Sequence, residues 1–211
     1  DYTGAAASYD IVAALTSNAN YSVSSNTAGT LTVLAKDVTV LVEDKSITYG
    51  DALPALTAVV SGLVTGEGND AVIGSIDVVD YNGQADTYVI EATLTGNTNY
   101  NVSVNTNGTL TVGAKDVTVV VENKSITYGD ALPALTAVVT GLVNGEGNSS
   151  IVASINVIDY NGQADTYVIE ATLTGNTNYN VTENTNGTLT VVAKDITVAV
   201  DSKSITFGED L

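Results

Sequence analysis

The sequence predicts an all-β fold, built from tandem small β-sandwich domains of the immunoglobulin-like (Ig-like) type in a linear rod. Three observations predict it. Short runs of apolar residues alternate with other residues at a period of two, no segment follows the 3.6-residue period of a helix, and a repeat of 79 residues divides the 211-residue chain. About six short strands in such a repeat are typical of a small sandwich.

The expected strands can be followed in order through one repeat. Val38, Val40 and Val42 alternate with Thr39, Leu41 and Glu43, which predicts a half-buried strand. The next strand candidates are residues 57–61, residues 72–81 before a turn at Asn82-Gly83, and the alternating residues 88–95.

A hairpin is expected near the end of the repeat. Residues 100–104 alternate, Asn107-Gly108 follows, and Leu110 and Val112 resume the alternation. Asn-Gly between two alternating segments is the strongest short-range hairpin signal, because both residues tolerate positive φ. Gly50 is likewise expected to take a positive φ, in the turn formed by residues 49–54.

The repeat sets the expected domain boundaries. Residues 36–114 and 115–193 align without a gap, and 65 of the 79 positions are identical. Residues 1–35 match the C-terminal part of a repeat, and residues 194–211 match the N-terminal strand region of a further one. We therefore expect two complete repeat domains between two partial ones, as a fragment of a longer array.

The composition argues against several function classes. The chain has no cysteine, histidine or arginine, and 24 acidic residues stand against six lysines, for a formal net charge of −18. Disulfides, thiolate chemistry and histidine bases are therefore absent, and nucleic acid and anionic membranes are repelled. No apolar run approaches the roughly 20 residues that cross a bilayer. We expect neither enzymatic activity, nor a nucleic-acid partner, nor membrane insertion in this segment.

Five segments in fixed order carry a resemblance to a known family. They are residues 46–56 (SITYGDALPAL), 61–67 (SGLVTGE), 87–90 (TYVI), 99–102 (NYNV) and 107–112 (NGTLTV). This order resembles the MBG-type tandem repeat of very large bacterial cell-surface proteins, adhesins in particular, and the resemblance covers the whole chain. It implies secretion, an extracellular place at the cell surface, and a stalk or adhesive role without a catalytic site. Part of the wider group has been compared with β-grasp folds, so β-grasp-like repeat domains are the alternative fold.

The tyrosines occupy only four positions of the repeat. Three positions hold tyrosine three times, and the fourth holds Tyr49, Tyr128 and then Phe207. Aromatic side chains could stack on sugars, but each also buries about 150–250 Å² in a core. Because Phe207 shows that one of these hydroxyls is dispensable, we favour core packing over ligand contact.

One turn gathers oxygen-bearing side chains. Residues 80–86 (DYNGQAD) surround Gly83, and calcium takes six to eight oxygen ligands from such loops. Thr3 and Ala7 replace two of these residues in the first partial repeat, which favours a plain Asx/Gly turn. Calcium remains the alternative, and no other cofactor is expected. The calcium candidates over the two complete repeats are Asp77, Asp80, Asn82, Asp86, Asp159, Asn161 and Asp165.

Two further expectations concern the edge and the end of the repeat. Seven of the 14 differences between the complete repeats fall in residues 70–79, which predicts an exposed loop leading into an edge strand. Val112 and Val117 both point inward but lie an odd number of residues apart, so a bulge, twist or change of sheet must fall within residues 113–116. So short a junction, without a Gly/Ser or Pro run, predicts a stiff connection.

These observations predict a structural and adhesive segment of a long extracellular bacterial fibre. Its expected partners are neighbouring repeats of the same chain, with other copies of the fibre and surface glycans as further candidates. The signal and anchor are expected outside this fragment. The alternative function is that each repeat is itself a glycan- or mucin-binding module.

Overall fold

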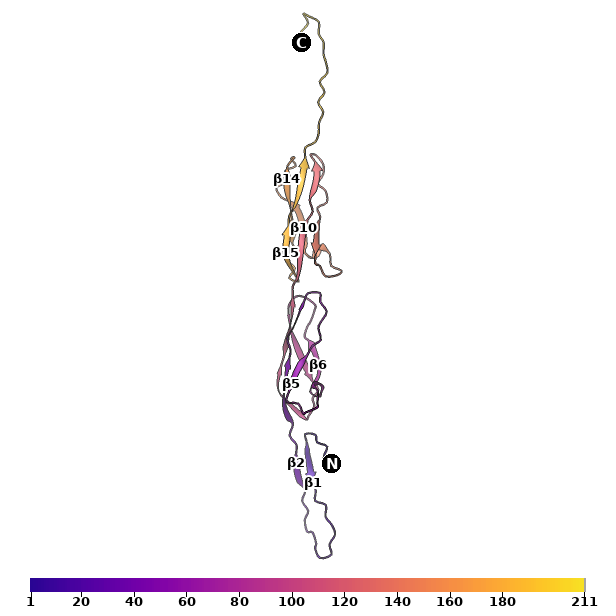
Figure 1. Cartoon of the computed structure of the whole chain (residues 1–211), viewed down its shortest axis with the longest axis vertical. Helices are drawn as coiled ribbons and strands as arrows, with labels where there is room; N and C mark the ends of the chain where they lie inside the picture. The colour runs from indigo at the N-terminus through magenta and orange to yellow at the C-terminus, as the bar shows by residue number, and fades with distance from the viewer. Residues whose placement is uncertain (211) are drawn as a thin grey trace. The chain divides into compact units, whose positions relative to one another are not determined.

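The computed structural model describes residues 1–210, which contain strands and two short 3₁₀ turns but no α-helix. The predicted all-β class is therefore confirmed. The chain divides into two compact units, with the division between Ala114 and Lys115, and each unit holds one complete repeat (Figure 1). Leu211, the last residue of the predicted partial domain 194–211, lies outside the described residues.

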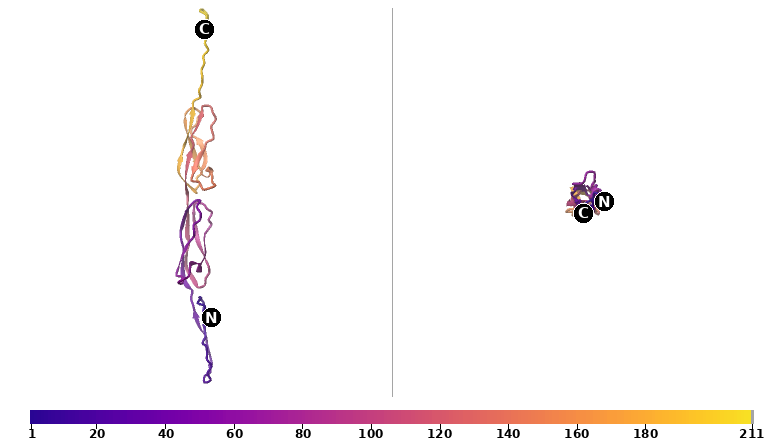
Figure 2. Two further views of the ribbon diagram at one scale, coloured as in Figure 1. Left: turned by 45° about the vertical axis from the view of Figure 1, so that its right-hand side comes forward. Right: turned by 90° about the horizontal axis from the view of Figure 1, so that it is seen from below.

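The first complete repeat contains seven strands and one 3₁₀ turn. These are β3 (Lys36–Val42), β4 (Lys45–Thr48), β5 (Ala58–Ser61), η1 (Asn69–Ala71), β6 (Ile73–Val78), β7 (Thr87–Leu94), β8 (Tyr100–Thr106) and β9 (Gly108–Gly113). One sheet has the strand order β5-β3-β8 and the other β4-β9-β7-β6. The strands run along the length of the repeat (Figure 2).

The second complete repeat has the same elements in the same order. They are β10 (Lys115–Val121), β11 (Lys124–Thr127), β12 (Ala137–Thr140), η2 (Asn148–Ser150), β13 (Val152–Val157), β14 (Thr166–Leu173), β15 (Tyr179–Thr185) and β16 (Gly187–Val192). Its sheets have the orders β12-β10-β15 and β11-β16-β14-β13.

The core lies between the two sheets of each repeat. Val38, Val40 and Val42 of β3 form one cluster with Ile90 of β7 and Leu110 of β9, and all five are buried. The predicted period of two therefore separates inward from outward side chains, as it must in a sheet. The two sheets of each complete repeat thus face each other across a core, as in a small sandwich, and residues 1–210 contain no α-helix.

Each sheet of a complete repeat contains one parallel pair, unlike the antiparallel sheets of immunoglobulin domains. The strand β3 runs parallel to β8, and β4 runs parallel to β9. The remaining neighbours, including β3–β5 and β6–β7, are antiparallel. The first two strands of a repeat thus lie beside its last two, β3 beside β8 and β4 beside β9, and point the same way.

The predicted hairpin at Asn107-Gly108 is wrong. The strands β8 and β9 belong to different sheets, and neither residue has a positive φ. The glycine is needed for a different reason, because the backbone of Val42 and Glu43, where β3 ends, passes directly beside it. By contrast, Gly50 and Gly83 do take positive φ, at 88° and 81°, as expected for turns.

The variable stretch lies where the sequence predicts it. Asp70 and Gly74 are exposed, and Ala71 is half-buried. The strand β6 is the edge of its sheet. An edge strand tolerates substitution because only one neighbour constrains it, so this prediction is confirmed.

The partial repeats are less ordered in their pairing. Residues 1–35 form one antiparallel pair, β1 (Ser8–Ile11) with β2 (Gly29–Thr32), and the Ala6 N–H donates to Asn99 Oδ1 at 2.7 Å. Residues 194–210 form no strand. The equivalent strand β10 pairs with β12 and β15, and residues 194–210 hold no counterpart of either.

The chain changes sheet at the end of the first complete repeat. The strand β9 ends at Gly113 and β10 begins at Lys115, each in a sheet of its own repeat. A single residue, Ala114, separates the strands. This accounts for the odd step between Val112 and Val117.

Candidate functional site

The two ends of each complete repeat form a continuous parallel pair, which we call the terminal ribbon. It comprises residues 36–48 beside residues 100–113 in the first repeat, and residues 115–127 beside residues 179–192 in the second. The ribbon passes from one sheet of the sandwich to the other partway along its length.

The register of the ribbon shifts once, next to Val38, and is the same on both sides of the crossing. Lys36 faces Tyr100 at its start, and Thr48 faces Gly113 at its end. Hydrogen bonds extend it at both ends, from the Lys36 N–H to the Asn99 carbonyl at 2.9 Å and from the Tyr49 N–H to the Gly113 carbonyl at 2.8 Å. A bulge next to Val38 leaves Ser103 without a partner in the ladder.

Gly108 allows both chains of the ribbon to cross between the sheets at the same level. A Cβ on Gly108 would lie 2.7 Å from the Glu43 carbonyl oxygen and 3.0 Å from that of Val42. The adjacent Thr109 N–H donates to Asp44 Oδ1 at 2.8 Å. Only a residue without a Cβ fits there, so the crossing fixes where the two chains meet.

The second repeat keeps this crossing although one of its residues differs. A Cβ on Gly187 would lie 2.7 Å from the Glu122 carbonyl oxygen. Asn123 replaces Asp44, and its Oδ1 still accepts from the Thr188 N–H at 2.8 Å. The substitution therefore preserves an oxygen acceptor and not a charge.

Side chains add bridges across the ribbon. Asn101 Nδ2 donates to Asp37 Oδ1 at 2.6 Å, and the unpaired Ser103 donates its hydroxyl to the Val38 carbonyl at 3.1 Å. The second repeat has the equivalent bridges from Asn180 to Asp116 and from Thr182 to the Val117 carbonyl. The change from serine to threonine retains the hydroxyl that makes the second bridge.

Tyrosines form much of the core, as predicted. Tyr88 and Tyr100 are buried in the first complete repeat, and Tyr167 and Tyr179 are buried in the second. Among the tyrosines of residues 36–193, only Tyr128 has an exposed side chain, at 44%. The core interpretation is therefore confirmed for the buried tyrosines, and the exposed Tyr2, Tyr21 and Tyr128 depart from it.

In the turn that holds the calcium candidate Asn82, oxygen atoms accept hydrogen bonds from a tyrosine hydroxyl. The Tyr88 hydroxyl lies 2.5 Å from Asn82 Oδ1 and 3.0 Å from the Gln84 carbonyl. Its ring packs edge-on against Tyr81, with centroids 5.1 Å apart. In the second repeat the Tyr167 hydroxyl makes the same contacts with Asn161 Oδ1 and the Gln163 carbonyl.

The first partial repeat explains which feature of this turn matters. Thr3 stands at the position of Asn82, and its hydroxyl lies 2.8 Å from the Tyr9 hydroxyl. Tyr9 also donates to the Ala5 carbonyl at 2.8 Å. Each turn thus supplies an oxygen to its tyrosine, whatever the residue.

Among the other calcium candidates, those that accept hydrogen bonds take them from different donors. Asp77 Oδ2 accepts from the Ser75 hydroxyl on β6, whereas Asp86 Oδ1 accepts from the Thr87 N–H. Asp80 has a positive φ of 52°, as does the equivalent Asp159 at 53°, and Asp165 accepts from the Thr166 N–H. Within residues 1–210, no group of three or more acidic residues is placed to hold a metal ion.

A second tyrosine ties a long loop to the ribbon. The Tyr100 hydroxyl donates to the Glu67 carboxylate and accepts from the Val64 N–H at 3.0 Å. The hydrogen bond to Glu67 raises the pKa of Tyr100 above its ordinary value. The equivalent Tyr179 binds Glu146 at 2.9 Å, and burial is the main cause of its raised pKa.

A small polar cluster flanks the crossing on the solvent side. Glu43 accepts from the Thr57 hydroxyl and pairs with Lys45 at 3.1 Å. These hydrogen bonds, with the charge of Lys45, lower the pKa of Glu43. Glu122, Thr136 and Lys124 repeat the arrangement, with the same lowering of the Glu122 pKa.

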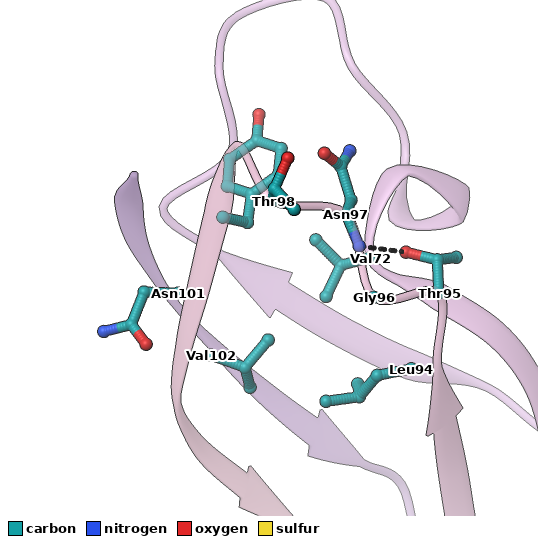
Figure 3. A pocket seen from close by; sticks show the side chains of 9 residues that line it. Val72, Leu94, Thr95, Gly96, Asn97, Thr98, Asn101 and Val102 are labelled. Carbon is teal, nitrogen blue, oxygen red and sulfur yellow. Dashed lines mark hydrogen bonds between the residues drawn. The ribbon is translucent and has the colours of Figure 1, made fainter. Parts of the chain in front are cut away.

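One cavity of about 310 Å³ opens beside the turn between β7 and β8 (Figure 3). Val72, Leu94 and Val102 form its apolar floor, and Asn97 and Thr98 lie at its polar rim. Asn97 Nδ2 donates to the Ala71 carbonyl at 3.1 Å, so this amide stabilises the turn through a hydrogen bond within the repeat.

Local sequence patterns did not reveal the terminal ribbon. Its paired residues lie 64 or 65 positions apart, and a period of two does not say which strands pair. One signal is present, since this position is glycine in both repeats (Gly108 and Gly187), but Asn-Gly in this place predicts a hairpin turn.

The comparisons with known proteins agree with the repeat frame. The model of the family described as MBG domain (YGX type) matches residues 38–111 and 117–190. The pairs Tyr49-Gly50 and Tyr128-Gly129 lie within the two matched ranges. No curated protein matches the chain.

Proposed function

This chain belongs to the MBG domain family of the YGX type. From that premise we propose that it is a stalk segment of a long extracellular bacterial surface fibre or adhesin. Tandem repeats of this family are compatible with such a role, and the family is one of structural and binding modules rather than of enzymes. The stalk spaces an adhesive part of the protein from the cell surface.

The terminal ribbon is the observation that carries this proposal. Because β3–β4 and β8–β9 run parallel, the chain enters a repeat at the Lys36 end and leaves it at the opposite, Gly113 end. Thirteen extended residues from 36 to 48 rise roughly 40 Å at about 3.3 Å per residue. Each repeat therefore carries the chain forward by its own length.

Features of sequence and junction support a stiff array. Only Ala114 separates β9 from β10, which leaves little backbone to act as a flexible linker. The hydrogen bond from Ala6 to Asn99 ties a partial repeat to the repeat that follows it. The net charge of −18 keeps neighbouring fibres solvated and apart.

No observation favours the alternative of a glycan-binding repeat. Such a module would present two or more exposed tyrosines in a shallow groove, and the first complete repeat exposes none of its four. Within residues 1–210 no helix has the length and hydropathy to cross a membrane. We assign no reaction and no metal to the segment.

The stalk proposal can be tested on intact cells that produce the protein. Gold-labelled antibodies against residues 1–211 should label the outside of the cell, and deletion of residues 36–114, one whole repeat, should bring an epitope beyond the segment closer to the envelope. The expected change is roughly 40 Å per repeat. Labelling only inside permeabilised cells, or an unchanged distance, would contradict the proposal.

A glycan array probed with the purified chain distinguishes the stalk proposal from the alternative of a glycan-binding module. The stalk proposal expects no retention on any sugar. Saturable binding that is lost in the Tyr128→Ala variant would instead support a glycan-binding module, because Tyr128 is the exposed tyrosine of the complete repeats.

A further inference from the structure

We propose that the terminal ribbon is a mechanical clamp, which holds each repeat folded when the fibre is pulled at its ends. This inference rests on the stalk function, since a stalk carries tension along its own chain. To the stalk proposal it adds which element of the repeat bears the tension, and along which direction that element resists unfolding.

The direction of the load follows from the register. Tension enters a repeat through the backbone before Lys36 and leaves through the backbone after Gly113, at opposite ends of the ribbon. The two chains are then pulled past each other along their length. The hydrogen bonds of the ladder lie across this direction, and those of a parallel pair are evenly spaced. They must therefore yield together and not one after another.

Side-chain bridges add to the resistance of the ladder. Asn101 to Asp37, Ser103 to the Val38 carbonyl, and the Thr109 N–H to Asp44 all join one chain of the ribbon to the other. The second repeat keeps all three kinds of bridge although two of the residues differ.

The crossing prevents the two chains from sliding by a small step. A shift of one residue would place Asn107 or Thr109 where Gly108 meets the Glu43 carbonyl oxygen, and any Cβ there would clash. The same shift would turn the buried valines of β3 toward solvent. The ribbon therefore has no neighbouring register into which it can slip under load.

Force spectroscopy with two pairs of attachment points tests the clamp. The chain has no cysteine, so introduced cysteines give defined handles on the full 211-residue chain. Lys36→Cys with Ala114→Cys pulls the ribbon lengthwise. Lys36→Cys with Thr98→Cys pulls both chains apart from the same end, so that their hydrogen bonds open in sequence. Both variants lose the same lysine, which makes them matched.

The clamp predicts a several-fold higher unfolding force for the lengthwise pair at equal loading rate. The length of chain released on unfolding distinguishes the two geometries. The attachment points lie 78 residues apart in the lengthwise pair and 62 in the other, which corresponds to roughly 280 and 220 Å of extended chain. The distance between the two points in the folded repeat is subtracted from each value. Equal forces, or a lower force for the lengthwise pair, would overturn the proposal.

A second pair of variants separates clamping from ordinary stability. Asp44→Ala with Ser103→Ala removes two bridges of the ribbon and should lower the lengthwise force. Tyr88→Phe removes a hydrogen bond outside the ribbon and should lower equilibrium stability while leaving that force nearly unchanged. If both variants lower the force equally, the ribbon is not the clamp. Surface labelling of cells is independent of these forces, so the stalk and the clamp can fail separately.

Discussion

Gly108 lies against the carbonyl oxygen of Glu43, so close that a Cβ on the glycine would stand 2.7 Å from it. The two residues are 65 positions apart and mark the point where the terminal ribbon passes from one sheet to the other. The backbone of each complete repeat is thus fixed at one place by the absence of a side chain. Gly187 and Glu122 show the same relationship in the second repeat.

Alanine at both crossings should destabilise the chain strongly. In Gly108→Ala with Gly187→Ala, each methyl group meets a backbone oxygen that cannot move without breaking the ribbon. We expect a loss of about 1–3 kcal/mol or more per repeat, as for overpacked cores. Urea unfolding followed by circular dichroism measures it.

Gly113→Ala is the matched control for this change. Its Cβ would meet nothing closer than the Ile47 carbonyl at 3.8 Å, and the second repeat already carries Val192 there. This variant should match or slightly exceed the original stability. Equal losses at Gly108 and Gly113 would refute the role given to the crossing.

The tyrosine beside Asn82 makes a second prediction. Tyr88→Phe with Tyr167→Phe removes hydroxyls that bond to the turns, and should cost about 1 kcal/mol in each repeat. Tyr81→Phe with Tyr160→Phe keeps the edge-on ring contacts and serves as the control, with little expected change. Thermal unfolding compares the two. A larger loss in the control would mean that the hydroxyls of Tyr88 and Tyr167 are not what stabilises the turns.

Removal of calcium should leave the protein unchanged. Asn82 and Asp86 direct their oxygens to internal donors, and Asp77 bonds to Ser75 on β6. The unfolding midpoint in excess chelator should therefore equal that in millimolar calcium, with magnesium at equal ionic strength as the control. A rise of the midpoint with calcium alone would support calcium binding by residues 77–86.

The sequence and the structure agree most closely where neighbouring residues alone determine the local structure. The alternation of Val38, Val40 and Val42 predicts their burial, and Gly50 and Gly83 take the positive φ expected of turns. The variability of residues 70–79 also predicts an edge strand correctly. In each case the signal comes from neighbouring positions, so a local pattern is sufficient.

The terminal ribbon could not be predicted in this way. Asn107-Gly108 has the composition of a hairpin turn, but its glycine is needed for a close backbone approach rather than for positive φ. The partner that imposes this need lies 65 residues earlier in the chain. Nothing in the alternation of β3 shows that it pairs in parallel with β8. For the calcium candidates, composition likewise gives the number of oxygens but not their directions.

The cavity of the first repeat predicts a stabilising substitution. Val72 is part of its floor, and the second repeat has the larger, buried Ile151 at this position. Val72→Ile should fill part of the space and gain up to about 0.8 kcal/mol, the value of one buried methylene group. The reciprocal Ile151→Val should cost about 0.5–1.5 kcal/mol. Urea midpoints that move in the same direction for both variants would contradict this account.

Acid should weaken each repeat through the cluster beside the crossing. Glu43 has a pKa below its ordinary value of 4.5 because it accepts from Thr57 and Lys45 and lies beside the lysine charge, and Glu122 has the same environment. A carboxyl group whose pKa is lowered by folding stabilises the folded state above its ordinary pKa, and this contribution is lost as the pH falls through the lowered value. Stability should therefore decline below about pH 4.5, when measured by urea unfolding at closely spaced pH values.

Glu43→Gln with Glu122→Gln should make that decline shallower and reduce stability at neutral pH. Glu91→Gln with Glu170→Gln is the control, because it removes the same number of carboxylates on β7 and β14 and leaves the cluster intact. High salt should weaken the Lys45 contribution but not the hydrogen bond from Thr57, so part of the pH dependence should persist. If the Glu43 and Glu91 pairs flatten the curve equally, the decline reflects net charge and not the cluster.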